Sequence, residues 1–216
     1  MKIAVLCTDC GHPVFPYLQE WVGQQRRLGH ETALHADVSQ LGEGELLFLV
    51  SCAQLVPPEV RNRFGHVLVL HASDLPDGRG WSPHVWSIVE GAKEITLCLL
   101  EAVDPVDTGP IWLRERIALK GTELLPDINR LLFAAELRLM TRCVEKLPEM
   151  KPEPQADRPG RYFRRRTAED SRIDPARTLA EQFDLLRVVD NDRYPAFFDF
   201  RGERYLLKIE KVSRGD

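Results

Sequence analysis

Short apolar runs recur along the first 119 residues of the chain, and segments with helical character separate most of them. Continuous apolar runs of this length are typical of strands that are buried on both faces, as in parallel sheets. The alternation therefore predicts an α/β fold, with a three-layer domain around a mostly parallel, twisted sheet. Six runs are expected to form strands: residues 2–7, 31–36, 46–52, 66–72, 94–102 and 109–119.

Helices are expected between these strands and after the last of them. The longest pattern covers residues 123–147, where Leu132, Leu139 and Val144 belong to one apolar face. Prolines near the start of two shorter segments, and a glycine at the end of two, are typical helix boundaries. The shorter helical segments are residues 15–30, 57–64 and 82–91.

The last third of the chain has a different organisation. Residues 148–160 are rich in proline and polar side chains, a composition typical of a linker. Beyond them, Asp174 precedes a proline and is the expected cap of a helix. A later segment predicts a hairpin that turns at Arg201-Gly202. We therefore expect a main domain at residues 1–148, and at 149–216 a linker with a small C-terminal subdomain of a helix and a hairpin.

Composition limits the partners and the location of the chain. A net charge of −4 offers no basic surface for long nucleic acids. No apolar run approaches the ~20 residues of a membrane span, and the N-terminal segment resembles a first strand rather than a signal peptide. The odd number of cysteines, five, favours reduced thiols. These features predict a soluble, cytoplasmic protein that binds neither nucleic acid nor membrane, and they leave its oligomeric state open.

Cys7 and Cys10 form a Cys-x-x-Cys pair directly after the first expected strand. Such a pair can be a redox centre or half of a zinc site. The sequence contains no second pair, and a single pair is weak evidence for either role. We therefore expect no metal and leave a redox role of this pair open.

The first candidates for chemistry follow two of the expected strands. In doubly wound sheets, reactive residues lie just past the carboxyl ends of parallel strands. His71 lies at the end of the run at 66–72, and Asp104 and Asp107 follow the run at 94–102. A neutral imidazole can accept a proton near pH 7, and a carboxylate beside it can orient the ring. His71 and Asp107 are thus a candidate base and orienting group, although a histidine at a strand end can equally be a packed, hydrogen-bonded residue.

Two stretches, HASDLPDGRGWSP and DPVDTGPIW, together resemble the formyltransferases that use 10-formyltetrahydrofolate. Residues 45–147 also follow that family's order of elements. The resemblance implies a Rossmann-like formyltransferase domain in which His71 is the base and Asp107 holds it. The matching positions are His71, Ser73, Leu75, Pro76, Gly80, Asp107 and Gly109.

One position departs from the family's pattern. The family has an asparagine two residues before the histidine, and this chain has Val69. That asparagine helps to stabilise the tetrahedral oxyanion, and the loss of one such donor can lower the rate by roughly 10²–10³. The donor could instead be protonated His71, Ser51, Gln54 or a backbone N–H of the turn after Pro76. Alternatively, the chain has lost the activity and is a silent binding protein.

The resemblance also implies two sets of ligand-binding residues. The loops expected to hold the folate contain Gln54, Leu55, Val56, Pro57, Trp81, Val103 and Asp104. The acceptor is expected to contact Ser73, Asp74, Arg79, Gly80, Tyr162, Arg164 and Arg165. Guanidinium groups suit a diphosphate, although the run at 164–166 can also be a solvated basic face. Tyr162 can stack on a base or pack in the core.

Residues 161–198 resemble the C-terminal extension of amino-sugar formyltransferases. The acceptor most like this match is a nucleotide-linked 4-amino-sugar, of the UDP-linked pseudaminic acid precursor type. That acceptor would place the chain in the biosynthesis of cell-surface polysaccharides. Formylation of a carrier-bound aminoacyl group is the alternative acceptor reaction.

Overall fold

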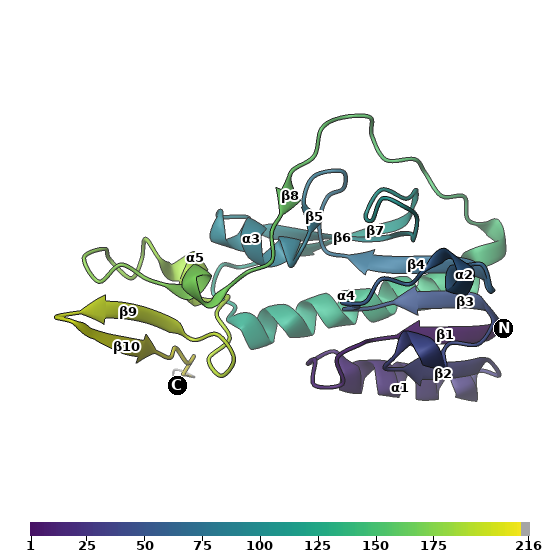
Figure 1. Ribbon diagram of the computed structural model, residues 1–216, viewed down its shortest axis with the longest axis horizontal. Coiled ribbons are helices and arrows are strands. Elements are labelled where there is room, and N and C mark those ends of the chain that lie inside the picture. Colours follow the sequence, from purple (N-terminus) through teal and green to yellow (C-terminus); the bar gives the residue numbers. More distant parts are fainter. Residues whose placement is uncertain (213–216) are drawn as a thin grey trace.

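The computed structural model describes residues 1–212 and confirms the α/β expectation. A six-stranded sheet forms its centre, with the strands in the order β2-β1-β3-β4-β6-β7 (Figure 1). The first four strands in this order are parallel. Their bounds are β2 Glu31–His35, β1 Lys2–Leu6, β3 Gly44–Leu49, β4 Phe64–His71, β6 Glu94–Glu101 and β7 Ile111–Ala118.

The strand β6 runs antiparallel to β4, and β7 antiparallel to β6. Leu68 is paired with Glu101 and His71 with Cys98, so β6 ends beside the middle of β4 rather than beside its carboxyl end. The expectation that residues 94–102 obey the rule for parallel strands was therefore wrong. Asp107 reaches the end of β4 because the loop after β6 folds back, as described below.

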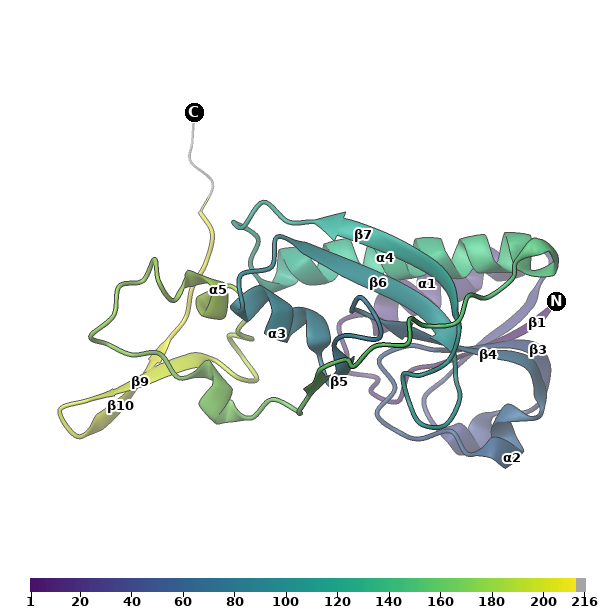
Figure 2. The same ribbon diagram turned by 90° about the horizontal axis from the view of Figure 1, so that it is seen from above.

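Helices cover one face of the sheet and only a short helix and loops cover the other (Figure 2). On the first face, α1 (Phe15–Arg27), α3 (Pro83–Val89) and α4 (Leu125–Lys146) bury the larger apolar cluster. On the second face, α2 (Pro58–Arg61) packs on a smaller cluster. Trp21 of α1 is buried against Phe48 and donates a hydrogen bond from Nε1 to Thr141 of α4 at 2.9 Å, which ties the two long helices together.

The segment after α4 is fixed along the main domain and is not a free linker. It returns across the upper side of the sheet in Figure 1. Glu153 and Ile111 exchange two backbone hydrogen bonds of 2.7 and 2.8 Å. Further on, the two-residue strand β8 (Tyr162–Phe163) pairs in parallel with β5 (Arg79–Gly80). Residues 153–161, which we call the strap, therefore connect two loops of the main domain.

The C-terminal hairpin is present where the sequence predicts it. It consists of β9 (Ala196–Phe200) and β10 (Glu203–Leu207). Arg201 and Gly202 have φ values of 52° and 87°, which is the positive-φ pair of a type I′ turn. The hairpin packs on Ile173, Leu186 and Val189 in a small cluster of its own.

The prediction that a helix starts at Asp174 is wrong, because the chain forms turns there. The carboxylate of Asp174 caps the N–H of Ala176 in a tight turn, and Gln182 bonds to both backbone groups of Asp174. A reciprocal pair of hydrogen bonds between Thr178 and Glu181 then starts the next turn. These side chains satisfy the backbone locally, so the α-helix α5 is confined to Phe183–Leu186.

Candidate active site

His71 is the last residue of β4, and its side chain is buried between two loops. Its Nε2 lies 2.9 Å from the carbonyl oxygen of Gly78, and its Nδ1 lies 3.6 Å from Oδ1 of Asp107. Each ring nitrogen thus faces an oxygen that can only accept. A neutral imidazole can donate to one of them, whereas imidazolium can donate to both. Nε2 is within hydrogen-bond distance of its oxygen, whereas the 3.6 Å between Nδ1 and Oδ1 of Asp107 is an ion-pair distance that is longer than a hydrogen bond.

Glycines allow the turn after β4 to fold back over His71. Gly78 has a φ of 80° and Gly80 a φ of 99°, a region that side chains with a Cβ rarely adopt. A Cβ on Gly78 would lie 2.7 Å from Cβ of Ser73, and one on Gly80 would lie 2.3 Å from the carbonyl oxygen of Phe163. The close approach of this turn therefore depends on both glycines.

Asp107 is held in the site by its own loop and by two other segments. Its φ of 60° is left-handed, which aspartate tolerates better than most residues. A Cβ on Gly109 would lie 2.0 Å from the carbonyl oxygen of Glu101, so the loop returns directly against the end of β6. The N–H of Gly80 donates to Oδ2 of Asp107 at 3.0 Å. Gln155 of the strap donates to the carbonyl oxygens of Asp107 and Gly109 at 2.8 and 2.9 Å.

Val69 packs in an apolar cluster with Leu100 and supplies no donor. The backbone of the turn offers none either, because each N–H from Asp77 to Trp81 already has an acceptor among the described residues. These acceptors are Asp74 O, Arg161 O for both Gly78 and Arg79, Asp107 Oδ2 and Phe163 O. Ser51 and Gln54 are exposed. Of the four replacement donors expected from sequence, protonated His71 could donate from Nε2 only if the turn moved the carbonyl oxygen of Gly78 away.

The residues expected to hold the folate lie in three places. Arg61 at the end of α2 forms an ion pair with Asp104, which connects the 54–57 segment with the loop that carries Val103. Leu55 is 79% exposed and Trp81 39% exposed, so both offer apolar surface to a ligand. Gln54 is exposed, Pro57 is half-buried at the start of α2, and Val56 packs in the smaller core cluster. The side chain of Val56 is therefore a packing group, and only its backbone could contact a ligand.

The three arginines expected to hold the acceptor have different partners for their positive charges. Arg164 forms an ion pair with Asp170, and this contact holds the pKa of the Asp170 carboxyl at about 2. The negative charge of Asp170 therefore balances the positive charge of Arg164. Arg165 lies 5.1 Å over the ring of Trp81. Arg79 donates to Oε1 of Gln155 at 3.3 Å.

The remaining acceptor candidates include one unpaired polar group. Oγ of Ser73 is buried and has no hydrogen-bond partner among the described residues, whereas Asp74 is exposed. Tyr162 is 64% exposed, while its neighbour Phe163 stacks on Trp86. The core-packing role considered for Tyr162 therefore belongs to Phe163.

Sequence reasoning missed Gln155 and Arg161 of the strap. Arg161 forms ion pairs with Asp77 and Glu90, and its hydrogen bonds to Asp77 hold the pKa of that carboxyl below its usual value. Both residues lie in or beside the stretch whose composition is typical of a linker. No local pattern distinguishes them from solvated side chains.

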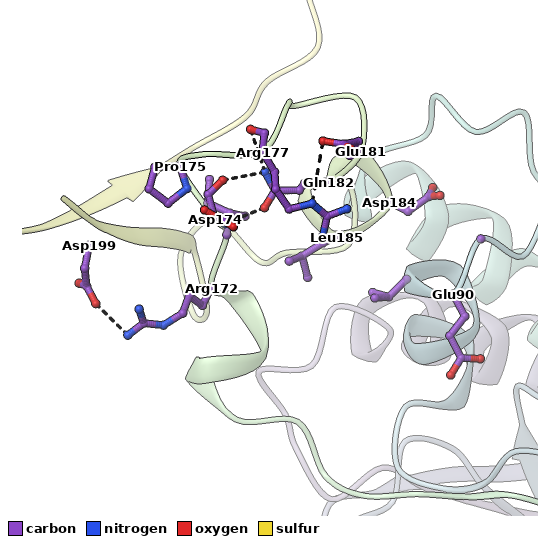
Figure 3. A pocket seen from close by; sticks show the side chains of 13 residues that line it. Glu90, Arg172, Asp174, Pro175, Arg177, Glu181, Gln182, Asp184, Leu185 and Asp199 are labelled. Atoms are coloured by element: carbon purple, nitrogen blue, oxygen red, sulfur yellow. Dashed lines mark hydrogen bonds and ion pairs between the residues drawn. The ribbon is translucent and has the colours of Figure 1, made fainter.

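Two cavities lie near these loops. One, of about 190 Å³, is lined by Ser73, Gly78 and His84, and burial lowers the pKa of His84 to about 4, so that this ring is neutral. The other, of about 670 Å³, lies between the end of α3 and the C-terminal unit (Figure 3). Its charged lining is mostly acidic and includes the Arg172–Asp199 ion pair of 2.8 Å. Neither His71 nor Asp107 lines it.

The formyl transferase family matches residues 7–144, and the chain belongs to this family. A methionyl-tRNA formyltransferase from Dinoroseobacter shibae is 29% identical over 181 residues, which are 83% of this chain and 60% of that protein. The chain thus spans about 60% of the length of this curated relative.

Solved structures share the fold at lower identity. A sugar N-formyltransferase from a Shewanella species has a TM-score of 0.73 and 16% identity, with 99% of both chains covered. HypX from Aquifex aeolicus in complex with tetrahydrofolic acid has a TM-score of 0.76 and 20% identity. The match covers this whole chain and 39% of HypX. Within residues 1–212, no helix is long and apolar enough to cross a membrane.

Proposed function

We propose that the protein transfers a formyl group from 10-formyltetrahydrofolate to an amine. The observation that carries the proposal is the contact of His71 with Asp107 at the end of β4, within the segment that matches the family. Further support comes from the family membership and from the structural likeness to HypX with bound tetrahydrofolic acid. The folate would lie along Leu55, Trp81 and the loop of Asp104.

In the proposed reaction, the amine nitrogen attacks the formyl carbon and forms a tetrahedral intermediate. His71 takes the proton that the nitrogen loses, and Asp107 stabilises the imidazolium. The bond from the formyl carbon to N10 of the folate then breaks, and N10 takes the proton from His71. The products are a formamide and tetrahydrofolate.

The resting geometry places one condition on this scheme. Nε2 of His71 is occupied by the carbonyl oxygen of Gly78, so the turn must shift before this nitrogen can accept a proton. Protonated His71 could instead donate from Nε2 to the oxyanion, in the role that Val69 cannot fill, and this role requires the same shift of the turn. The two roles require opposite protonation states, and the pH dependence considered in the Discussion distinguishes them.

We propose a nucleotide-linked 4-amino-sugar, with UDP as the nucleotide, as the acceptor. Support comes from the tail at 161–198, from the exposed Arg165 and Tyr162, and from the likeness to a sugar N-formyltransferase over nearly the whole chain. A transfer RNA, the acceptor named for the curated relative, is disfavoured by the net charge of −4. A carrier-bound aminoacyl group remains the alternative. These substrates and the free thiols fit a cytoplasmic location.

The test is formyl transfer with purified protein and 10-formyltetrahydrofolate. Nucleotide-linked 4-amino-sugars, aminoacyl-carrier conjugates and charged initiator transfer RNA are supplied in parallel. We expect release of tetrahydrofolate and formylation only with the sugars. Formylation of the transfer RNA alone would refute the sugar proposal, and no turnover with any acceptor would count against formyl transfer.

A silent folate or sugar-nucleotide binding protein is the second candidate. Two observations favour it, namely Val69 in the oxyanion position and the occupied Nε2 of His71. If the wild-type protein binds but does not turn over, the variant Val69→Asn is expected to gain measurable transfer, because one donor is worth roughly 10²–10³ in rate. Val69→Leu is the matched control, since it changes the side chain without adding a donor. Failure of Val69→Asn to exceed this control would show that the missing donor is not the cause.

A further inference from the structure

We propose that Gln155 is a positioning residue that holds Asp107 against His71. This inference deepens the proposed function and rests on the roles given there to His71 and Asp107. Gln155 belongs to the strap, outside the segment that matches the family. Its side-chain amide donates two hydrogen bonds to the Asp107 loop. It accepts one hydrogen bond from Arg79, in the turn that contains Gly78 and Gly80. The amide therefore joins this turn to the Asp107 loop.

Asp107 needs such an external support. Its backbone is left-handed, and a residue other than glycine is strained there by about 1 kcal/mol or more. Among the described residues, no other donor bonds to the carbonyl oxygen of Asp107. The N–H of Gly80 holds the carboxylate at Oδ2 but not the backbone, and the other contacts of the loop are the Arg61–Asp104 ion pair and the bond from Thr108 to Pro105. Gln155 therefore fixes the peptide that aims the carboxylate.

The strap itself is anchored on both sides of Gln155. Two residues earlier, Glu153 pairs with the start of β7 through two backbone hydrogen bonds. Further along, a Cβ on Gly160 would lie 1.7 Å from the carbonyl oxygen of Pro76, and the carbonyl oxygen of Arg161 accepts from both Gly78 and Arg79. Gln155 is half-buried, whereas its neighbours Pro154 and Ala156 are exposed. Its place in the site is thus fixed by chain geometry on either side.

Loss of this support has a predictable effect on the reaction. Nδ1 of His71 and Oδ1 of Asp107 are 3.6 Å apart, and Oδ2 is already used by Gly80. A displacement of about 1 Å at a reacting group can lower the rate by up to about 10²-fold. The folate residue Asp104 lies in the same loop as Asp107 but is held separately by its ion pair with Arg61, and among the acceptor residues only Arg79 is hydrogen-bonded to Gln155. The turnover number should fall while the Michaelis constant for the formyl donor changes little.

The test compares Gln155→Glu and Gln155→Ala with the control Glu153→Gln, whose exposed side chain is changed while its backbone pairing is kept. Gln155→Glu keeps the shape but replaces the donating amide by a carboxylate that faces two carbonyl oxygens. We expect kcat to fall about 10-fold to 100-fold in both Gln155 variants, with KM for the formyl donor within about twofold. A purely space-filling side chain would tolerate the glutamate, so wild-type kcat in a folded Gln155→Glu protein would overturn the proposal.

A second readout does not need turnover. Ring ¹⁵N chemical shifts of His71 report which nitrogens carry protons, and they should change in both Gln155 variants but not in Glu153→Gln. Unchanged ring shifts in folded Gln155 variants would overturn the positioning role. Changed ring shifts would support it even if the wild-type protein formylated no amine, so a failure of the proposed function is distinguished from a failure of this inference.

Discussion

At the residue scale, the site is defined by one imidazole between two acceptors. The sequence could predict that His71 ends a strand, and His71 and Asp107 both match motifs, while their catalytic roles stay predictions. It could not predict that the carbonyl oxygen of Gly78 occupies Nε2, because this contact depends on how far the glycine turn folds back. The role of Gln155 could not be predicted either, because its hydrogen bonds go to Asp107 and Gly109, which precede it by 48 and 46 positions in the chain.

The roles of the pair can be tested by substitution. His71→Asn and Asp107→Asn are each expected to lower kcat by about 10²-fold to 10⁴-fold, as for the loss of a general base or of the group that orients it. His66→Asn is the matched control, because His66 lies on the same strand and contacts Glu101 rather than Asp107. Steady-state kinetics and far-UV circular dichroism measure activity and folding. Wild-type rates in both variants would show that this pair is not catalytic.

The pH dependence of kcat separates the two roles of His71. If His71 is the base, its neutral form is active, and kcat rises with pH to a plateau. If protonated His71 is the oxyanion donor, kcat falls again as the pH rises through its titration. The acceptor amine must be neutral in both cases and contributes the same rising limb. The donor role would be identified if kcat of the wild-type protein falls at alkaline pH while the residual kcat of His71→Asn does not.

At the element scale, the positions of the strands were easier to predict than the directions in which they run or the structure of the segments that connect them. Apolar runs located all six strands of the central sheet, because burial on both faces leaves a strong pattern. The antiparallel direction of β6 depends on the path of the chain after α3, which no local pattern records. The helix expected at Asp174 failed because the side chains of Asp174 and Gln182 bond to nearby backbone groups instead.

The helix α4 carries a buried carboxyl group that makes stability depend on pH. Glu136 is 6% exposed, one of its oxygens has no hydrogen-bond partner among the described residues, and burial raises its pKa from 4.5 to about 8. The unfolded chain therefore releases this proton at lower pH than the folded protein does. Stability is fully present below about pH 4.5 and falls as the pH rises toward 8.

Glu136→Gln should remove this loss. We expect the variant to match the wild type near pH 4 and to exceed it near pH 8 by on the order of 3 kcal/mol in the free energy of unfolding. Urea unfolding at several pH values measures the difference. Glu145→Gln, at an exposed position of the same helix, is the control. A difference that does not vary with pH would contradict the burial argument.

At the scale of the whole molecule, the C-terminal unit is joined to the main domain by charge and by packing. Arg187 is 2% exposed and lies 3.4 Å from Glu123, at the start of the chain segment that leads into α4. Val188 belongs to the larger apolar cluster of the main domain. Arg193 donates to the carbonyl oxygen of Gly11 at 2.7 Å. Units that the sequence separates at a linker are therefore in extensive contact.

Breaking the buried ion pair should destabilise the whole protein. Arg187→Ala removes the charged partner of the Glu123 carboxylate, which keeps its hydrogen bonds from the N–H groups of Lys120 and Gly121, so we expect a cost of at most about 3–5 kcal/mol. Arg130→Ala removes an exposed pair with Asp127 and should cost less than about 1 kcal/mol. Chemical denaturation gives both values. Equal small losses in the two variants would mean that the contact between the units contributes little to stability.

The strap also has a consequence for the order in which the chain becomes functional. All six strands of the sheet and the helix α4 are synthesised before Gln155, Gly160 and Arg161. A nascent or prematurely terminated chain can therefore contain all six strands while it lacks both Val188 of the larger apolar cluster and the strap that joins the two loops around His71. Under the proposed function, we expect such a product to be impaired in formyl transfer, because it lacks the Gln155 side chain that bonds to the Asp107 loop.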